Sequence, residues 1–133
     1  MTVVNRTLER AQVMLADLAV SAGIRDVEAL TLDEAVEQPV DLIVNATSAG
    51  MAPHMESSPW ITGVPVPKNV ILYDMVYRPA RTHLMQQVEA AGGTAIGGLG
   101  MLVRQGAVSF QRWTGVEPPL DVMFEAARGA LET

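Results

Sequence analysis

The sequence predicts an α/β fold built on a doubly wound, mostly parallel sheet. Strand patterns and helical patterns alternate along the chain, which is typical of βα units. Residues 40–44 form a short, largely apolar run rich in β-branched side chains, which favours a strand buried on both faces of a parallel sheet. Residues 45–50 follow this strand directly. They are therefore expected at the carboxyl edge of the sheet, where open α/β sheets bind ligands.

The first part of the chain predicts a strand, a helix and a second short strand. Residues 2–4 have the pattern of a strand end. An amphipathic helix is expected next, ending before Gly23, because apolar residues recur at spacings of three and four. These apolar residues are Leu8, Ala11, Leu15, Leu18 and Ala22. A short strand over 27–30 and a helical turn over 32–36 complete this part.

The rest of the chain repeats the alternation. The expected strands are 70–73 and 94–96, and the expected helices are 82–91, a helix after Gly98 and a final helix that opens at Pro118 and Pro119. The core stripe of the helix after Gly98 is Leu99, Leu102, Val103, Gly106, Phe110 and Trp113, and the final helix is expected to bury Met123, Ala127 and Leu131. Residues 52–68 are proline-rich, which predicts a long surface loop.

Composition narrows the class of protein. A chain of 133 residues is one domain or part of one. The absence of cysteine excludes a disulfide scaffold and a thiolate metal site, and fits the cytoplasm. A net charge of −6 without a basic cluster argues against nucleic acid, and no apolar run is long enough to span a bilayer. We therefore expect a cytoplasmic protein with neither a nucleic-acid nor a membrane partner.

Polar residues after the first strand predict how a nucleotide is recognised. In a dinucleotide fold, the tip of the second strand meets the adenosine ribose. Here Arg6 offers a charged fork to a 2′-phosphate, Arg10 lies one helical turn later, and Asn5 and Thr7 supply neutral hydrogen bonds. With no carboxylate at this tip, the pattern favours NADP over NAD. The alternative is that Thr7 only caps the helix while both arginines are solvated.

Two later strand ends also carry candidate ligand contacts. Asn45, Thr47 and Ser48 place an amide and two hydroxyls after the strand at 40–44, although a polar turn that only ends a strand is the alternative. Met75 and Tyr77 follow the strand at 70–73.

Glycines at 97, 98 and 100 allow the backbone to approach a flat ligand closely. Met101 and Gln105 then share one stripe of the following helix. Simpler alternatives exist for each feature, because glycines also start helices for steric reasons, Met101 could belong to the core and Tyr77 could be structural.

In this order, the motifs over residues 5–11, 41–48, 73–77 and 98–105 resemble the carboxyl-terminal, cofactor-binding part of shikimate dehydrogenases. The resemblance covers essentially the whole chain. It implies a partial, Rossmann-like NADP-binding domain over 1–133, with carboxyl-terminal helices at about 98–132. It also implies an oxidoreductase that reversibly reduces 3-dehydroshikimate to shikimate with NADPH, in aromatic amino-acid biosynthesis.

The resemblance further implies a role for each matching residue. The implied cofactor-binding residues are Asn5, Arg6, Thr7, Arg10, Asn45, Thr47, Ser48, Met75, Gly98 and Met101. The first four would hold the 2′-phosphate end of NADP, and the others would line its ribose and nicotinamide side. Tyr77 and Gln105 would touch the substrate.

Several parts of the family pattern have no counterpart in these residues. They are the catalytic Lys and Asp, the first Rossmann strand and the Gly-rich pyrophosphate loop; Lys68, the only lysine, lies outside any matching motif. We therefore expect a fragment without a catalytic residue, either a homodimer or a partner of an amino-terminal half on another chain. The strands at Val3 and Val40 would pair with another chain or become direct neighbours. The alternatives are an NAD-dependent quinate or shikimate dehydrogenase and a non-catalytic, nucleotide-binding or dimerising remnant.

Overall fold

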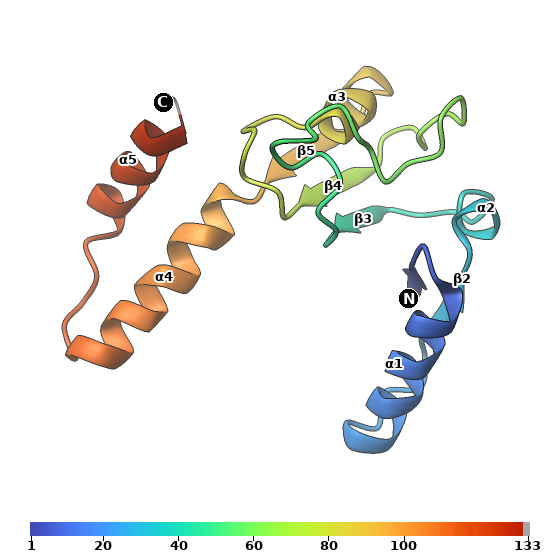
Figure 1. Cartoon of the computed structure of the whole chain (residues 1–133), viewed down its shortest axis with the longest axis horizontal. Helices are drawn as coiled ribbons and strands as arrows, with labels where there is room; N and C mark the ends of the chain where they lie inside the picture. Colours follow the sequence, from blue (N-terminus) through green and yellow to red (C-terminus); the bar gives the residue numbers. More distant parts are fainter. Residues whose placement is uncertain (132–133) are drawn as a thin grey trace. The chain divides into compact units, whose positions relative to one another are not determined.

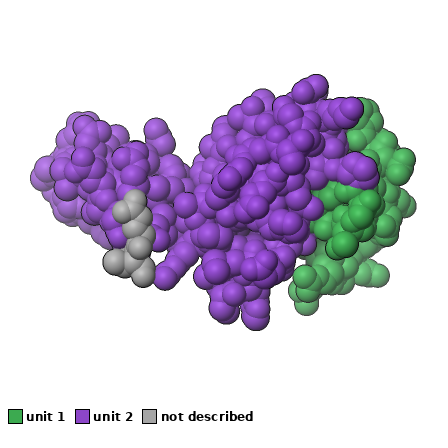
Figure 2. All heavy atoms as spheres, turned by 90° about the horizontal axis from the view of Figure 1, so that it is seen from above, with its two compact units in different colours: residues 1–39, 60–64 green, residues 40–59, 65–133 purple. Residues whose placement is uncertain are grey.

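The computed structural model describes residues 1–131 and divides into two compact units (Figures 1 and 2). Unit 1 comprises residues 1–39 and 60–64, and unit 2 comprises residues 40–59 and those from 65 onward. Parallel strands alternate with helices in both units, so the predicted α/β class is confirmed. Within residues 1–131, no helix is both long and apolar enough to cross a membrane.

Unit 1 is a two-stranded parallel sheet with a long helix. Its elements are β1 (Thr2–Val4), α1 (Leu8–Ser21), β2 (Glu28–Leu30) and α2 (Leu32–Ala35). β1 pairs with β2, with Thr2 opposite Glu28, and α1 contacts both strands. The left-handed φ of 67° at Gly23 follows the end of α1, as the sequence predicts. The short α2 begins with a capping box between Thr31 and Glu34, and these hydrogen bonds lower the pKa of the Glu34 carboxyl.

Unit 2 is a three-stranded parallel sheet followed by two long helices. Its elements are β3 (Leu42–Asn45), β4 (Ile71–Asp74), α3 (His83–Ala90), β5 (Thr94–Gly97), α4 (Leu99–Thr114) and α5 (Leu120–Leu131). The strand order is β3-β4-β5. Asn45 lies opposite Asp74, and Asp74 lies opposite Gly97. The three carboxyl ends are therefore aligned along one edge of the sheet.

One face of this sheet is covered and the other is open. α3 contacts β4 and β5, and Leu72 of β4 is buried with Leu84 and Val88 of α3. On the other face Leu42 is 56% exposed and Val44 is 54% exposed. The expectation that this strand is buried on both faces is therefore wrong. β3 is an edge strand within the described residues, and no element covers its outward side chains there.

The helices α4 and α5 pack against each other (Figure 1). Val103 is buried, as the predicted core stripe requires, whereas Gly106 is half-buried and the other buried residue of α4, Ala107, lies outside that stripe. The last part of the stripe is wrong, because Phe110 is exposed and Trp113 is 85% exposed. The last turns of α4 lie beyond the sheet, and among the described residues of unit 2 the element that packs beside them is α5 (Figure 1).

The final helix buries its apolar side less than the sequence predicts. Met123, Ala127 and Leu131 are half-buried instead of buried. The expected end of this helix at about 132 lies outside the described residues.

Strand pairing within residues 1–131 leaves edges unpaired. β1 pairs with β2 alone, and β3 pairs with β4 alone. The rearranged sheet in which the strands at Val3 and Val40 become direct neighbours is therefore not formed. Pairing of these edges with another chain stays a prediction.

Candidate functional site

The turn between β1 and α1, together with the first turn of α1, presents the predicted phosphate-binding residues. Asn5, Arg6, Thr7 and Arg10 are all exposed. The Asn5 Oδ1 accepts a hydrogen bond from the Thr7 backbone N–H at 2.9 Å, and the Arg10 N–H donates to the Thr7 carbonyl at 3.1 Å. Thr7 stands at the N-cap of α1, yet its hydroxyl makes no capping hydrogen bond. The alternative role for Thr7, that its side chain only caps the helix, is therefore not supported by a hydrogen bond.

Arg6 of the turn and Arg10 of α1 make no ion pair within the described residues. Within residues 1–131, the one ion pair joins Arg81 to Glu89 in unit 2. Arg6 and Arg10 therefore face solvent at the amino terminus of α1, where the helix dipole also favours an anion. Two guanidinium groups, an amide and a hydroxyl are a donor set suited to a phosphate.

At the carboxyl edge of the unit 2 sheet, three polar side chains are almost completely buried. Asn45 is 4% exposed, Asp74 0% and Thr82 1%. The Asn45 Nδ2 donates to the Asp74 Oδ1 at 3.0 Å, and the Thr82 hydroxyl donates to the Asp74 Oδ2 at 2.6 Å. Sequence reasoning proposed Asn45 but missed Asp74 and Thr82. The available signal was that Asn45 and Asp74 both end neighbouring strands.

The turn after β3 is organised by the Asn45 side chain. Its Oδ1 accepts hydrogen bonds from the Thr47 backbone N–H at 3.0 Å and from the Thr47 hydroxyl at 2.7 Å. The Thr47 hydroxyl in turn accepts from the Ala49 N–H at 3.1 Å. Ser48 is exposed beside it. Residues 45–49 are thus held in one conformation at the sheet edge.

The turns after β4 and β5 meet this first turn. The Met75 N–H donates to the Asn45 carbonyl at 3.0 Å, and the Gly98 N–H donates to the Val76 carbonyl at 3.1 Å. A Cβ atom at Gly98 would lie 2.1 Å from the Met75 carbonyl oxygen, so no other residue fits without a backbone shift. The structure therefore brings Asn45, Met75 and Gly98 together, with the half-buried Met101 in the first turn of α4.

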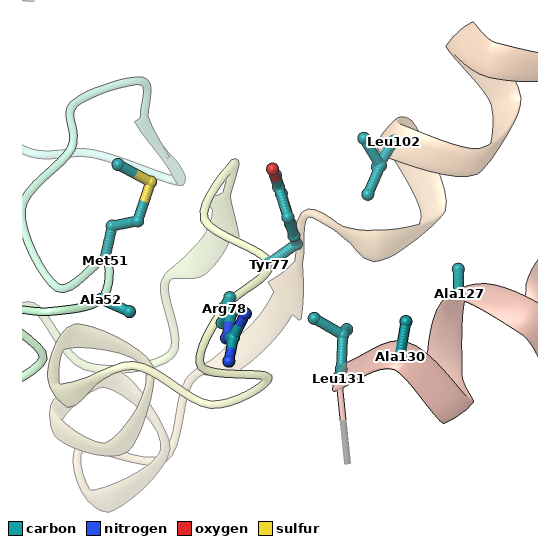
Figure 3. Close-up of a pocket in the computed structure, with 8 residues that line it drawn as sticks. All are labelled: Met51, Ala52, Tyr77, Arg78, Leu102, Ala127, Ala130 and Leu131. Atoms are coloured by element: carbon teal, nitrogen blue, oxygen red, sulfur yellow. The ribbon is translucent and has the colours of Figure 1, made fainter. Parts of the chain in front are cut away.

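Tyr77 lines an open hollow of about 430 Å³ (Figure 3). Its side chain lies between Met51 and Leu102, and α5 contributes Ala127, Ala130 and Leu131 to the lining. Gln105 does not line this hollow, since its Nε2 donates to the Leu102 carbonyl of its own helix at 2.9 Å. The two predicted substrate contacts are thus not brought together within the described residues.

Comparison with known proteins relates this arrangement to one family. Residues 98–128 match the family model described as the shikimate 5′-dehydrogenase carboxyl-terminal domain. A shikimate dehydrogenase (NADP(+)) of Methanopyrus kandleri is 40% identical over 128 residues, covering 93% of this chain and 44% of that protein. The chain corresponds to the carboxyl-terminal portion of shikimate dehydrogenases.

Solved structures agree with this assignment. A shikimate dehydrogenase crystallised in complex with NADP+ superimposes with a TM-score of 0.88 at 33% identity, over 98% of this chain and 46% of that one. A quinate dehydrogenase of Corynebacterium glutamicum in complex with NAD gives a TM-score of 0.79 at 28% identity, over 93% of this chain and 44% of that one. The chain spans less than half the length of these shikimate and quinate dehydrogenases.

Proposed function

We propose that this chain is the cofactor-binding part of an NADP-dependent shikimate dehydrogenase. The whole enzyme reversibly reduces 3-dehydroshikimate to shikimate with NADPH, in aromatic amino-acid biosynthesis. The observation that carries this proposal is the convergence of Asn45, Met75 and Gly98 at the carboxyl edge of a parallel sheet, the position at which open α/β folds bind ligands.

Each group of predicted residues has its own task in this proposal. In unit 1, Arg6 and Arg10 bind the 2′-phosphate of NADP, and Asn5 and Thr7 add neutral hydrogen bonds. In unit 2 the cofactor's ribose and nicotinamide side is lined by Asn45, Thr47, Ser48, Met75, Gly98 and Met101. When bound, NADPH supplies the hydride, so the task of these residues is to hold and orient the nicotinamide ring.

Substrate contact and proton transfer complete the proposal. Tyr77 and Gln105 contact shikimate, whereas proton transfer falls to the family's catalytic Lys and Asp, which have no counterpart in residues 1–133. A homodimer of this chain is one assembly to be tested. The cytoplasmic location and the absence of nucleic-acid and membrane partners stay predictions from composition.

The experiment is to co-express the chain with the amino-terminal half of the Methanopyrus kandleri relative. Shikimate and quinate are then each assayed with NADP and with NAD, which gives four pairs of substrate and cofactor. Shikimate with NADP is expected to give the highest kcat/KM. The second candidate, an NAD-dependent quinate or shikimate dehydrogenase, is favoured by the fold similarity to the quinate dehydrogenase crystallised with NAD. It predicts the highest kcat/KM with NAD. A non-catalytic remnant predicts no turnover with any pair.

Arg6→Asp in the assembled enzyme is expected to shift cofactor preference from NADP toward NAD. The substitution replaces a cation that binds the 2′-phosphate with a carboxylate that can accept a hydrogen bond from a 2′-hydroxyl. We expect a loss of roughly 1–3 kcal/mol in NADP binding, the scale of a charge-assisted contact. The measurement is the ratio of kcat/KM for NADP to that for NAD. Arg25→Asp, at another exposed arginine of unit 1, is the matched control. An unchanged ratio in Arg6→Asp would contradict the assignment.

Gln105→Ala and Tyr77→Phe in the assembled enzyme are expected to impair the use of shikimate with little change in NADP affinity. Both residues lie past the carboxyl edge of the sheet, and Tyr77 lines the hollow in Figure 3. Steady-state kinetics with both substrates varied measure the two effects separately. Gln111→Ala, on an exposed part of the same helix, is the control. A raised KM for NADP with unchanged shikimate parameters would show that the two sites have been exchanged.

A further inference from the structure

Asp74 is a completely buried carboxylate without a cationic partner. Its three hydrogen-bond donors are all neutral: the Asn45 Nδ2, the Thr82 hydroxyl and the Val76 backbone N–H, the last at 3.0 Å. The one ion pair within residues 1–131 lies elsewhere. A buried charge costs stability unless its hydrogen bonds are complete, and an apolar residue at such a position is often more stable. The cost suggests a role other than stability.

The chemistry of a carboxylate determines how Asn45 must lie. An ionised carboxylate only accepts hydrogen bonds, whereas an amide has a donor end and an acceptor end. Asp74 therefore draws the Asn45 Nδ2 toward itself and leaves the Asn45 Oδ1 facing the turn. That oxygen is the acceptor of both Thr47 hydrogen bonds. With a neutral amide at position 74, both orientations of the Asn45 side chain could be satisfied.

Thr82 supports the other end of the same turn. Its hydroxyl donates to Asp74 and also accepts from the Met85 N–H at 3.3 Å, which fixes it as the N-cap of α3. A Cβ at Gly50 would lie 3.4 Å from the Thr82 Cβ, so the end of the turn packs on this side chain. The buried group thus contacts the turn at Asn45 and at Gly50.

We propose that Asp74 is a positioning residue that sets the conformation of residues 45–50 by orienting the Asn45 amide, and that holds residues 75–77 through the Val76 N–H. The claim about the turn depends only on these contacts. The consequence for the cofactor, correct placement of the nicotinamide end, rests on the proposed function. Of the predicted site residues, only Asn45 has to contact Asp74 for this role.

The test uses Asp74→Asn in the 133-residue chain, a substitution that keeps size and shape but removes the charge. Amide NMR spectra are expected to show shifted Thr47 and Val76 resonances and faster amide exchange at both, with the unit 1 resonances unchanged. NADP and 2′,5′-ADP, which lacks the nicotinamide half, are then titrated separately. We expect about a tenfold rise in the Kd for NADP, as for one lost hydrogen bond to a charged group, and less than about a twofold change for 2′,5′-ADP.

Each outcome decides the proposal. Unchanged Thr47 and Val76 resonances, an unchanged NADP affinity, or an equal loss for both ligands would overturn it. If the unaltered chain binds neither ligand, the proposed function fails, and the NMR comparison alone decides the role of Asp74. If Asp74→Asn does not fold, Thr82→Val removes one donor, and it must reproduce the changes at Thr47 while Thr82→Ser, which keeps the hydroxyl, restores them.

Discussion

A polypeptide of residues 1–133 alone is expected to show no detectable oxidation of shikimate by NADP+. The family's catalytic Lys and Asp have no counterpart in these residues, and general acid–base catalysis alone contributes about 10²–10⁴ in rate. The loop that receives the cofactor pyrophosphate in the family also has no counterpart, so only weak NADP binding is expected. The measurement is NADPH formation followed by absorbance, with the chain alone and with the amino-terminal half of a relative added.

The assembled enzyme is the positive control for this result. Activity that appears only on addition of the amino-terminal half would support the proposal that this chain binds the cofactor and that the amino-terminal half supplies the proton-transferring residues. Full turnover by the 133-residue chain, or a well-behaved monomer that binds NADP tightly, would contradict it.

Gly98→Ala is expected to have the largest effect on stability of any single methyl addition to the sheet edge. The new Cβ would lie 2.1 Å from the Met75 carbonyl oxygen, and a backbone atom cannot move aside as a flexible side chain can. Overpacking that forces a backbone shift typically costs about 1–3 kcal/mol, and the short distance here puts the expected cost at the upper end, about 3 kcal/mol. The measurement is the free energy of unfolding from urea denaturation followed by circular dichroism.

Gly129→Ala is the matched control, because it adds the same methyl group within α5, where the new Cβ would have no atom of residues 1–131 within 4 Å besides its chain neighbours and its own helix backbone. There the substitution should raise the free energy of unfolding by roughly 0.5–1 kcal/mol, since alanine favours the helix. If Gly98→Ala unfolds at the same urea concentration as the unaltered chain, the close approach of the β5–α4 turn to Met75 is not a feature of the folded protein.

Local patterns predicted the elements well because each rests on short-range information. The spacing of apolar residues in α1, the glycine that follows it and the β-branched run before Asn45 all led to the observed elements. Burial was harder to predict. Leu42, Val44 and Trp113 are apolar and exposed, because whether an apolar face is covered depends on which other elements reach it. No periodicity within β3 or α4 contains that information.

Some residues of the candidate site could likewise be predicted from the sequence, and others could not. Asn45, Met75 and Gly98 could be predicted to meet, because parallel strands end at one edge of their sheet. The same rule could have placed Asp74 beside Asn45, but it could not have predicted the hydrogen bond from the Thr82 hydroxyl, because Thr82 lies outside the strands. The orientation of Gln105 toward its own helix also depends on side-chain geometry that helical spacing does not specify.

The strand order of the two sheets has a consequence for how the chain acquires its structure. Each strand pairs with the strand that precedes or follows it in the sequence, in both β1-β2 and β3-β4-β5. Every pairing is therefore closed by a single crossover, which keeps the contact order low for a parallel sheet and favours rapid folding. During synthesis, β2, β4 and β5 each leave the ribosome after a strand with which they pair. The sheets can then grow one strand at a time, from the amino terminus onward.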